Sequence, residues 1–266
     1  MTPIDLVSNQ AFNQLTVEHP RLGAALRQGE QQRIHTLAAL MSGARFKGLD
    51  ELLRYFDELG RVFTADPEFS KLAFLISRCV ADFETAIEAT LSCYLSVAID
   101  AMRDVMEIEN LLLDFAIHHG HVDQWLAADQ KTLRTKFSAA SVRDRLHAAG
   151  EGRYATTAQS LDYRAHSAAL HVSPHQHPVA AKGFSAEQGW SGDAGFWEIF
   201  EHARRLQTAI RRFVGAIRPA SPVDALANRE LPDVNDAWKR TQEMQNMYLA
   251  VLQASTKTHP EDGAGS

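Results

Sequence analysis

The sequence has few residues that interrupt helices. Its 266 residues include only 15 glycines and 9 prolines, and most of these stand at the ends of long uninterrupted stretches. Alanine, leucine, glutamine, glutamate and arginine, which favour helices, fill those stretches. No alternation of apolar and polar residues with a period of two persists long enough to predict a sheet. The sequence therefore predicts an all-α protein.

Cysteine is scarce as well. Cys79 and Cys93 are the only two, and within one straight helix their spacing would separate them by about 21 Å along the axis. A disulfide bond requires a much shorter separation. We therefore expect two free thiols, as in proteins of reducing compartments.

The chain also lacks signals for membranes and an excess of positive charge. It has no apolar run of the roughly 18 residues that a membrane-spanning helix needs, and its start lacks the basic and then apolar order of a signal peptide. These absences predict a cytoplasmic protein without a membrane partner. The formal net charge of −6 excludes nonspecific binding of polyanions by the whole surface, so any nucleic-acid surface must be a local patch.

Motifs for nucleotide cofactors and for several common catalytic centres are missing too. The sequence contains no glycine-rich phosphate loop, nucleophile elbow, Cys-x-x-Cys pair or His-Glu-x-x-His segment. We therefore expect no cofactor.

What the sequence does contain is a series of segments with the apolar spacing of amphipathic helices. The block of residues 69–119 holds neither glycine nor proline. Because this block is longer than an ordinary globular helix, we expect a break near Ser92 to Ser96 or one very long hairpin arm. A turn is expected around Gly48, and one or two helical turns around Trp125. The remaining predicted helical segments are residues 5–18, 21–41, 49–63, 138–149, 155–172, 193–217 and 233–255.

Glycines and prolines gather between Ser173 and Gly195, where the apolar spacing is lost. This composition predicts a long exposed loop. The expected fold is a multi-helix bundle with long core helices and a loop-rich insert before the penultimate helix. Its predicted parts are an N-terminal helical region (residues 1–66), a bundle core (residues 67–256) with the loop at residues 173–195, and a disordered tail (residues 257–266).

The most specific motif is the segment Tyr163-Arg164-Ala165-His166-Ser167-Ala168-Ala169-Leu170-His171. Arg164 and His171 are separated by two helical turns, so both side chains can face one groove. An imidazole can move a proton, and an arginine can stabilise the charge that develops on a phosphate. Ser167 lies between the two and can hydrogen-bond to either.

An Arg-x(4–6)-His motif near the start of a late helix resembles the signature of HEPN-type helical domains. Many of these are metal-independent ribonucleases of toxin and antiviral systems, and they assemble their site across a homodimer. The resemblance implies an RNA-acting protein with His171 as general acid and base, Arg164 as phosphate stabiliser and Ser167 as orienting group. The signature usually has a polar residue directly after the arginine, whereas here His166 follows one place later.

The same segment is similar to one in a group of uncharacterised bacterial helical proteins. In that group an upstream helix carries Arg-x-x-x-Glu, which Arg103 and Glu107 match here. The similarity implies that this pair and Tyr163 support the catalytic residues, and we expect Glu107 to contact Tyr163 or Arg164. A purely structural interpretation remains open, because Arg103 and Glu107 also have the spacing of an ordinary helix ion pair.

Arginines recur every seven residues in the predicted helix 193–217. One series contains Arg204 and Arg211, and the other contains Arg205 and Arg212. Since the opposite stripe of this helix is apolar, the arginines can form a basic ridge that follows a phosphate backbone. The alternative is a solvated face paired with the acidic remainder of the protein.

Histidines form two groups along the sequence. His118, His119 and His121 make up the first, and the members of the second are His166, His171, His175 and His177. Imidazoles from both groups could share a transition metal, although the helix dipole alone also favours histidine at a helix C-terminus. Two alternatives to an RNA-acting protein therefore stay open: a non-catalytic protein-interaction module and a histidine-rich metal-binding protein.

Overall fold

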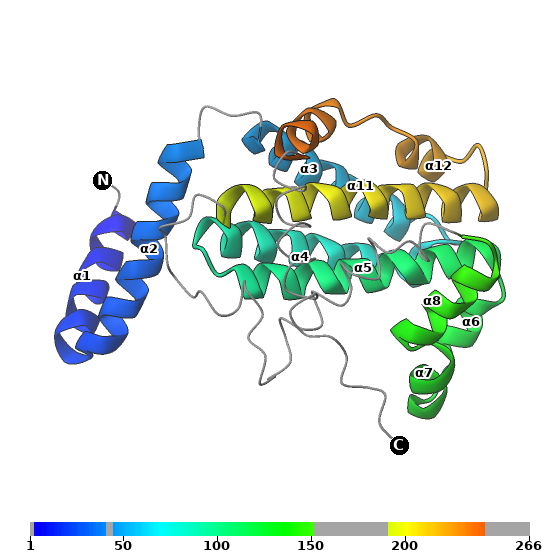
Figure 1. Cartoon of the computed structure of the whole chain (residues 1–266), viewed down its shortest axis with the longest axis horizontal. Helices are drawn as coiled ribbons and strands as arrows, with labels where there is room; N and C mark the ends of the chain where they lie inside the picture. The colour runs from blue at the N-terminus through cyan, green and yellow to red at the C-terminus, as the bar shows by residue number, and fades with distance from the viewer. Residues whose placement is uncertain (1–2, 41–44, 152–190, 243–266) are drawn as a thin grey trace, which may run out of the picture.

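The computed structural model describes residues 3–40, 45–151 and 191–242. The part of the chain within these ranges is built from helices and short turns and contains no strand (Figure 1). The all-α prediction is confirmed. No helix within these ranges has both the length and the apolar character needed to cross a bilayer.

Three long helices lie side by side at the centre of the bundle. These are α4 (Ala73–Leu91), α5 (Leu95–Ile117) and α11 (Ser191–Ile217), and α5 packs against both of the others (Figure 1). A fourth helix, α3 (Arg45–Ala65), packs on α4. The predicted multi-helix bundle with long core helices is therefore what the chain forms.

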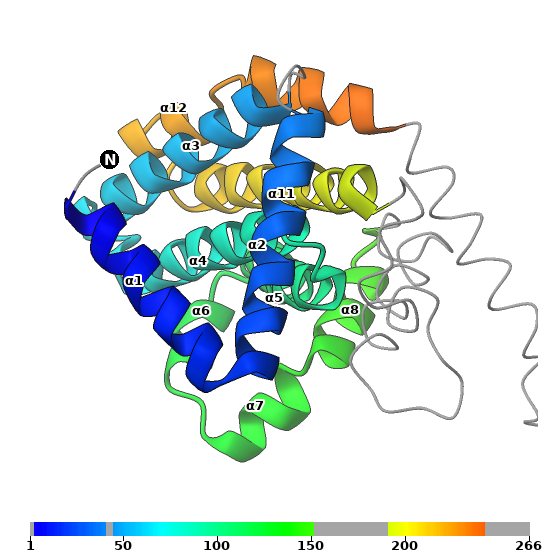
Figure 2. The ribbon, with the colours of Figure 1, turned by 90° about the vertical axis from the view of Figure 1, so that its left-hand side faces the viewer.

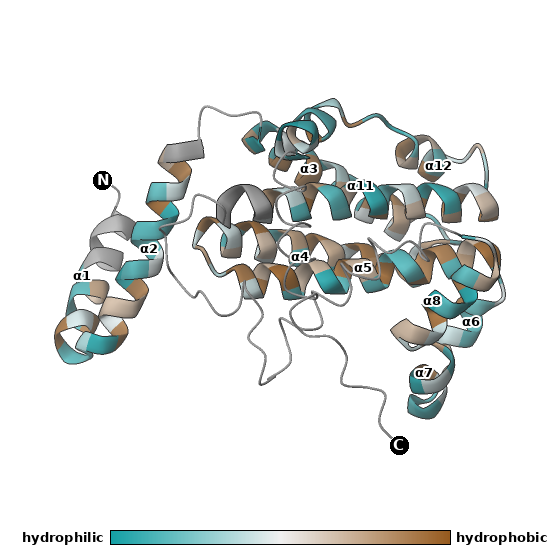
Figure 3. Cartoon of the chain, viewed as in Figure 1, coloured by the Kyte–Doolittle hydropathy of each residue, from teal (hydrophilic) through white to brown (hydrophobic). Residues whose placement is uncertain are grey.

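The interior of the bundle is rich in phenylalanine. Phe83 of α4 contacts Phe56 of α3 with ring centroids 5.1 Å apart, and Phe115 of α5 contacts Phe213 of α11 at 6.3 Å. All four side chains are buried, and the hydropathy colouring in Figure 3 shows apolar residues along the inner faces of α4 and α5. Burial of these faces provides the main driving force for folding.

The break expected between the two long helices is confirmed. Helix α4 ends at Leu91 and α5 begins at Leu95, which lets α5 run back along α4. Cys93 lies in the turn with a φ of 61°, in the left-handed region that non-glycine residues seldom adopt. Both Cys79 and Cys93 are free thiols, as expected.

The first two helices form a hairpin that extends from the body. Helices α1 (Pro3–Glu18) and α2 (Pro20–Leu40) pack against each other, and α2 touches α4 (Figures 1 and 2). The hairpin exposes several large apolar side chains, namely Val17, Leu22, Leu26 and Ile34. The part of residues 1–66 that stands apart is thus the hairpin, whereas α3 belongs to the bundle core.

Three short helices cover the opposite end of the bundle: α6 (His121–Leu126), α7 (Gln130–Lys136) and α8 (Ala139–Ala148) (Figure 1). Helix α8 is capped at both ends, because the Ser138 side chain accepts a hydrogen bond from the Ser141 backbone N–H and Gly150 after its last turn has a φ of 82°. Helix α7 was not anticipated, since its seven residues have no buried face.

Two predicted interruptions prove to be helical. Gly48 was expected in a turn, but it lies inside α3, where the absence of a side chain lets the helix approach Ala237 and Phe200. The predicted loop ended at Gly195 and overlapped the predicted helix 193–217, but residues 191–195 all belong to α11, and Gly195 packs directly on Thr90. In both places glycine permits close packing between helices instead of a change of chain direction.

The remaining predictions fall partly outside the described residues. The predicted last helix is confirmed over residues 233–242, and a short helix that was not predicted, α12 (Pro222–Ala227), precedes it. The predicted helix 155–172, residues 173–190 of the predicted loop and the tail 257–266 lie outside the ranges that the structure describes.

Candidate functional site

The described part of the predicted site is the pair Arg103 and Glu107 on α5. The Arg103 Nη2 atom lies 3.2 Å from the Glu107 Oε1 atom, and the two side chains are 28% and 36% exposed. The two residues therefore pair with each other at the surface of α5. The other residues predicted for this site lie outside the described ranges: Tyr163, Arg164, His166, Ser167 and His171.

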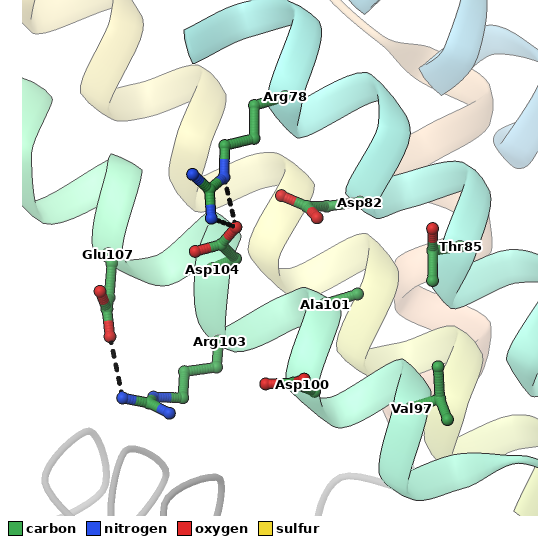
Figure 4. Close-up of a pocket in the computed structure, with 9 residues that line it drawn as sticks. All are labelled: Arg78, Asp82, Thr85, Val97, Asp100, Ala101, Arg103, Asp104 and Glu107. Carbon is green, nitrogen blue, oxygen red and sulfur yellow. Dashed lines mark hydrogen bonds and ion pairs between the residues drawn. The ribbon is translucent and has the colours of Figure 1, made fainter.

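Arg103 and Glu107 line a pocket of about 340 Å³ on the outer side of α4 and α5 (Figure 4). Charged side chains from both helices converge on it, and the close-up shows them arranged around one opening. Its lining residues are Arg78, Asp82, Thr85, Val97, Asp100, Ala101, Arg103, Asp104 and Glu107. The α5 ion pair is thus one edge of a larger polar site.

Arg78 and Asp104 connect the two helices across this pocket. The Arg78 guanidinium donates hydrogen bonds to the Asp104 carboxylate, and this bonding raises the pKa of Arg78 above its usual value. Asp82 lies beside this pair without an arginine of its own (Figure 4). Burial, followed by the negative charge of Asp104, raises the pKa of Asp82 to about 6.

The pocket combines four carboxylates with two guanidinium groups, so its net charge is negative when all are ionised. A negative pocket repels phosphate, which excludes it as a phosphate-binding site by itself. A carboxyl group whose pKa is near 6 can exchange a proton close to neutral pH, as general acids and bases do.

The arginines of α11 do not form one continuous ridge. Arg205 pairs with the buried Glu109 of α5 at 3.1 Å, and Arg212 pairs with Glu151. On another side of the helix, Arg204 stacks on the Trp238 ring with its Cζ atom 3.7 Å from the ring centroid and donates a hydrogen bond to Asn235. Arg211 is exposed. Three of the four predicted RNA-binding arginines thus have partners within the protein.

The first histidine group belongs to a hydrogen-bonded network. His121 Nδ1 lies 2.8 Å from the buried Asp114 carboxylate, which also accepts two hydrogen bonds from Arg145. Burial alone would raise the pKa of Asp114, but the hydrogen bonds from Arg145 and His121 outweigh it and lower the pKa. His118 stacks against His121 with ring centroids 4.8 Å apart. Across the described ranges, no three metal-binding side chains are arranged to hold a metal ion.

Sequence reasoning missed the most deeply buried charged residues. Glu109 and Asp114 on α5 are 1% and 0% exposed, and Glu198 and His202 on α11 form a buried pair with Oε2 and Nε2 3.2 Å apart. Their common signal is a charged residue within an otherwise apolar stretch of a helix. Such a residue is retained only if the fold supplies a partner.

Comparison of the chain with protein-family models, with curated proteins and with solved structures finds no match. Its function must therefore be inferred from its own residues.

Proposed function

We propose that the protein is HEPN-like and acts on RNA as a metal-independent ribonuclease of a defence or toxin system. The observation that carries the proposal is the sequence of the segment Tyr163 to His171, in which Arg164 and His171 are seven positions apart. The protein would act in the cytoplasm as a homodimer, with its site assembled from both copies. The all-α bundle agrees with the helical fold that the HEPN resemblance implies.

The proposed chemistry is cleavage of the RNA backbone by its own 2′-hydroxyl group. The hydroxyl oxygen attacks the phosphorus atom while the bond from phosphorus to the 5′-oxygen breaks. His171 takes the proton of the hydroxyl group and supplies a proton to the leaving oxygen. Arg164 stabilises the charge on the phosphate, and Ser167 and His166 orient these two groups.

The polar surface of α5 supports this proposal. Arg103 and Glu107 form an ion pair that remains partly exposed, so it can contact a polar helix. The pocket that they border contains Asp82, whose pKa of about 6 adds a group that can exchange protons near neutral pH. This arrangement agrees with a supporting role for Arg103, Glu107 and Tyr163.

The direct test is cleavage of mixed RNA under reducing conditions with a chelator present. The substitutions Arg164→Ala and His171→Ala should each lower the rate by about two to four orders of magnitude, and the helical circular dichroism signal should stay unchanged. A matched control is Arg21→Ala with His35→Ala, because both residues are exposed on α2. A wild-type protein that cleaves no RNA would contradict the proposal.

A protein-interaction module is the second candidate, and the N-terminal hairpin favours it. Val17, Leu22, Leu26 and Ile34 are 46–82% exposed, and exposed apolar side chains in a group often mark a binding surface. If this function holds, replacing Leu22 and Ile34 with serine abolishes co-purification of a partner protein, while Arg164→Ala and His171→Ala leave it intact.

A further inference from the structure

An exposed aromatic pair lies at the end of the bundle opposite the N-terminal hairpin. The Phe74 ring at the start of α4 is stacked on the Trp125 ring of α6, with a centroid distance of 5.9 Å and an interplanar angle of 4°. Phe74 is 51% exposed, whereas the other side of Trp125 packs against Phe115 of the core. The pair therefore presents a flat aromatic surface on a rigid support.

Positive charge is concentrated around this pair. Residues 118–147 contain five lysines and arginines, three aspartates and no glutamate, within a chain whose net charge is −6. Helix α7 contributes Lys131 and Arg134, which are exposed. Over residues 118–147, cations thus exceed carboxylates by two, whereas the whole chain is net negative.

The aromatic pair and the cations are carried by adjoining elements. Helix α7 follows α6 after a short connection, and the Lys136 side chain donates a hydrogen bond to Gln124 of α6, which holds the two helices together. Lys71 lies before α4 and pairs with Asp123 of α6 at 2.7 Å. We call this the α6–α7 surface and define it by Lys71, Phe74, Trp125, Lys131 and Arg134.

The two exposed cations of α7 differ from most of the arginines of α11 in what they contact. Arg205 is bound to the buried Glu109, and releasing it would leave a buried charge without a partner. By contrast, Lys131 and Arg134 form no ion pair with any residue in the described ranges. Phosphate can therefore bind to the α7 cations without disrupting the fold.

We propose that the α6–α7 surface binds single-stranded RNA. An unpaired base stacks on Phe74, which Trp125 supports from behind, and Lys131 and Arg134 contact the neighbouring phosphates. Aromatic side chains beside cations bind single strands because every unpaired base has a face that can stack. This inference rests on the proposed action on RNA and adds that the substrate is held as a single strand by residues that do not belong to the cleavage motif.

The test measures binding of a fluorescently labelled 12-nucleotide oligouridine RNA to the full chain. Every protein carries His171→Ala, so that the RNA is not consumed. Phe74→Ala should weaken binding about tenfold. The double substitution Lys131→Glu with Arg134→Glu should weaken RNA binding by at least as much. It should also reduce the magnitude of the slope of the logarithm of the binding constant against the logarithm of the salt concentration by about 1.4, since each of the two lost phosphate contacts contributes about 0.7.

The matched control is Lys47→Glu with Arg61→Glu, because both residues are exposed on α3 and the change in net charge is the same. The control should keep its affinity within about threefold of the parent protein. Phe74→Leu serves as a second test of stacking, since it preserves an apolar side chain and removes the ring. It should weaken binding as Phe74→Ala does.

Each outcome separates this inference from the proposed ribonuclease. If the parent protein binds RNA and the Phe74 and α7 variants match the control, the inference is wrong and the ribonuclease proposal stands. If the variants lose affinity but the wild-type chain cleaves nothing, the surface is assigned correctly and the ribonuclease proposal fails. Absence of RNA binding by the parent protein overturns the inference, and cleavage of mixed RNA by the wild-type chain then decides the ribonuclease proposal separately.

Discussion

Asp114 connects three helices through one carboxylate. It is fully buried on α5 and accepts hydrogen bonds from Arg145 of α8 and from His121 of α6. We expect Asp114→Ala to lower the free energy of unfolding by about 3–5 kcal/mol, because a cation would be left partly buried without its acceptor. The control Asp123→Ala removes a carboxylate that is 79% exposed and should cost below about 1 kcal/mol. If urea unfolding gave similar losses of free energy for the two variants, Asp114 would not have this role.

The same carboxylate makes stability depend on pH at the acidic side. Because the pKa of Asp114 is lowered in the folded state, its ionised form stabilises the fold at pH values above the unfolded pKa. That contribution is lost as the pH falls towards the folded pKa. Asp114→Asn should therefore reduce the fall in stability between about pH 5 and pH 2, measured by urea unfolding at each pH.

The contribution of Asp82 to stability depends on pH with the opposite sign. Its pKa is raised from 3.8 to about 6, so the folded state holds a proton more tightly than the unfolded state, and the contribution of Asp82 to stability falls as the pH rises from about 4 to 6. Asp82→Asn should have little effect at pH 4 and should raise the melting temperature by about 2–4 °C at pH 7. The exposed Asp57 supplies the control Asp57→Asn, whose effect should not change over this range. A constant effect of Asp82→Asn would show that burial and Asp104 do not raise the pKa of Asp82.

At the scale of residues, the sequence predicts pairs along one helix better than pairs between helices. The spacing of Arg103 and Glu107 predicts their ion pair, which the structure contains. The sequence does not distinguish Glu107 from Glu109, although Glu109 is buried against Arg205 of α11, 96 residues away. Its burial follows from how α5 packs on α11, and one helix considered alone does not contain that information.

Helix α3 contains two glycines with different roles. A Cβ atom at Gly48 would lie 2.7 Å from the Ala237 Cβ atom and 3.0 Å from the Asp233 carbonyl oxygen, whereas at Gly60 it would lie 3.7 Å from Ile76. Gly48→Ala should therefore lower the free energy of unfolding by about 1–3 kcal/mol through overpacking. Gly60→Ala should raise it by about 0.5–1 kcal/mol, because alanine favours the helix. Chemical denaturation of both variants measures these changes in the free energy of unfolding. Equal changes in the two variants would rule out the close approach at Gly48.

Long helices are the elements that the sequence predicts well. The periodic apolar residues and the lack of glycine and proline indicate α4, α5 and α11 to within a few residues. The short helices α7 and α12 were missed because six or seven residues are too few to show a period. Glycine was interpreted wrongly at Gly48, since its use in close packing there depends on helices that are distant in sequence.

For the molecule as a whole, the N-terminal hairpin is the least integrated part. One contact to the bundle is the Arg33–Glu88 ion pair, in which both side chains are 41% or more exposed, and such pairs contribute little. A chain that lacks residues 1–40 should unfold cooperatively with a melting temperature lowered by no more than about 2–4 °C. Loss of the cooperative transition in circular dichroism would show that the hairpin is part of the folding unit.

The two thiols differ in their surroundings in a way that has a chemical consequence. Burial raises the pKa of Cys79 well above its usual value, which protects it from alkylation. Cys93 lies in the turn below α2, with its Sγ atom 4.0 Å from the Gln32 side-chain oxygen and from the Thr36 hydroxyl oxygen. Of the two thiols, Cys93 is thus the one that a reagent can reach, and it lies where the hairpin meets the bundle. The rate at which a maleimide alkylates Cys93 therefore measures how often the hairpin separates from the bundle.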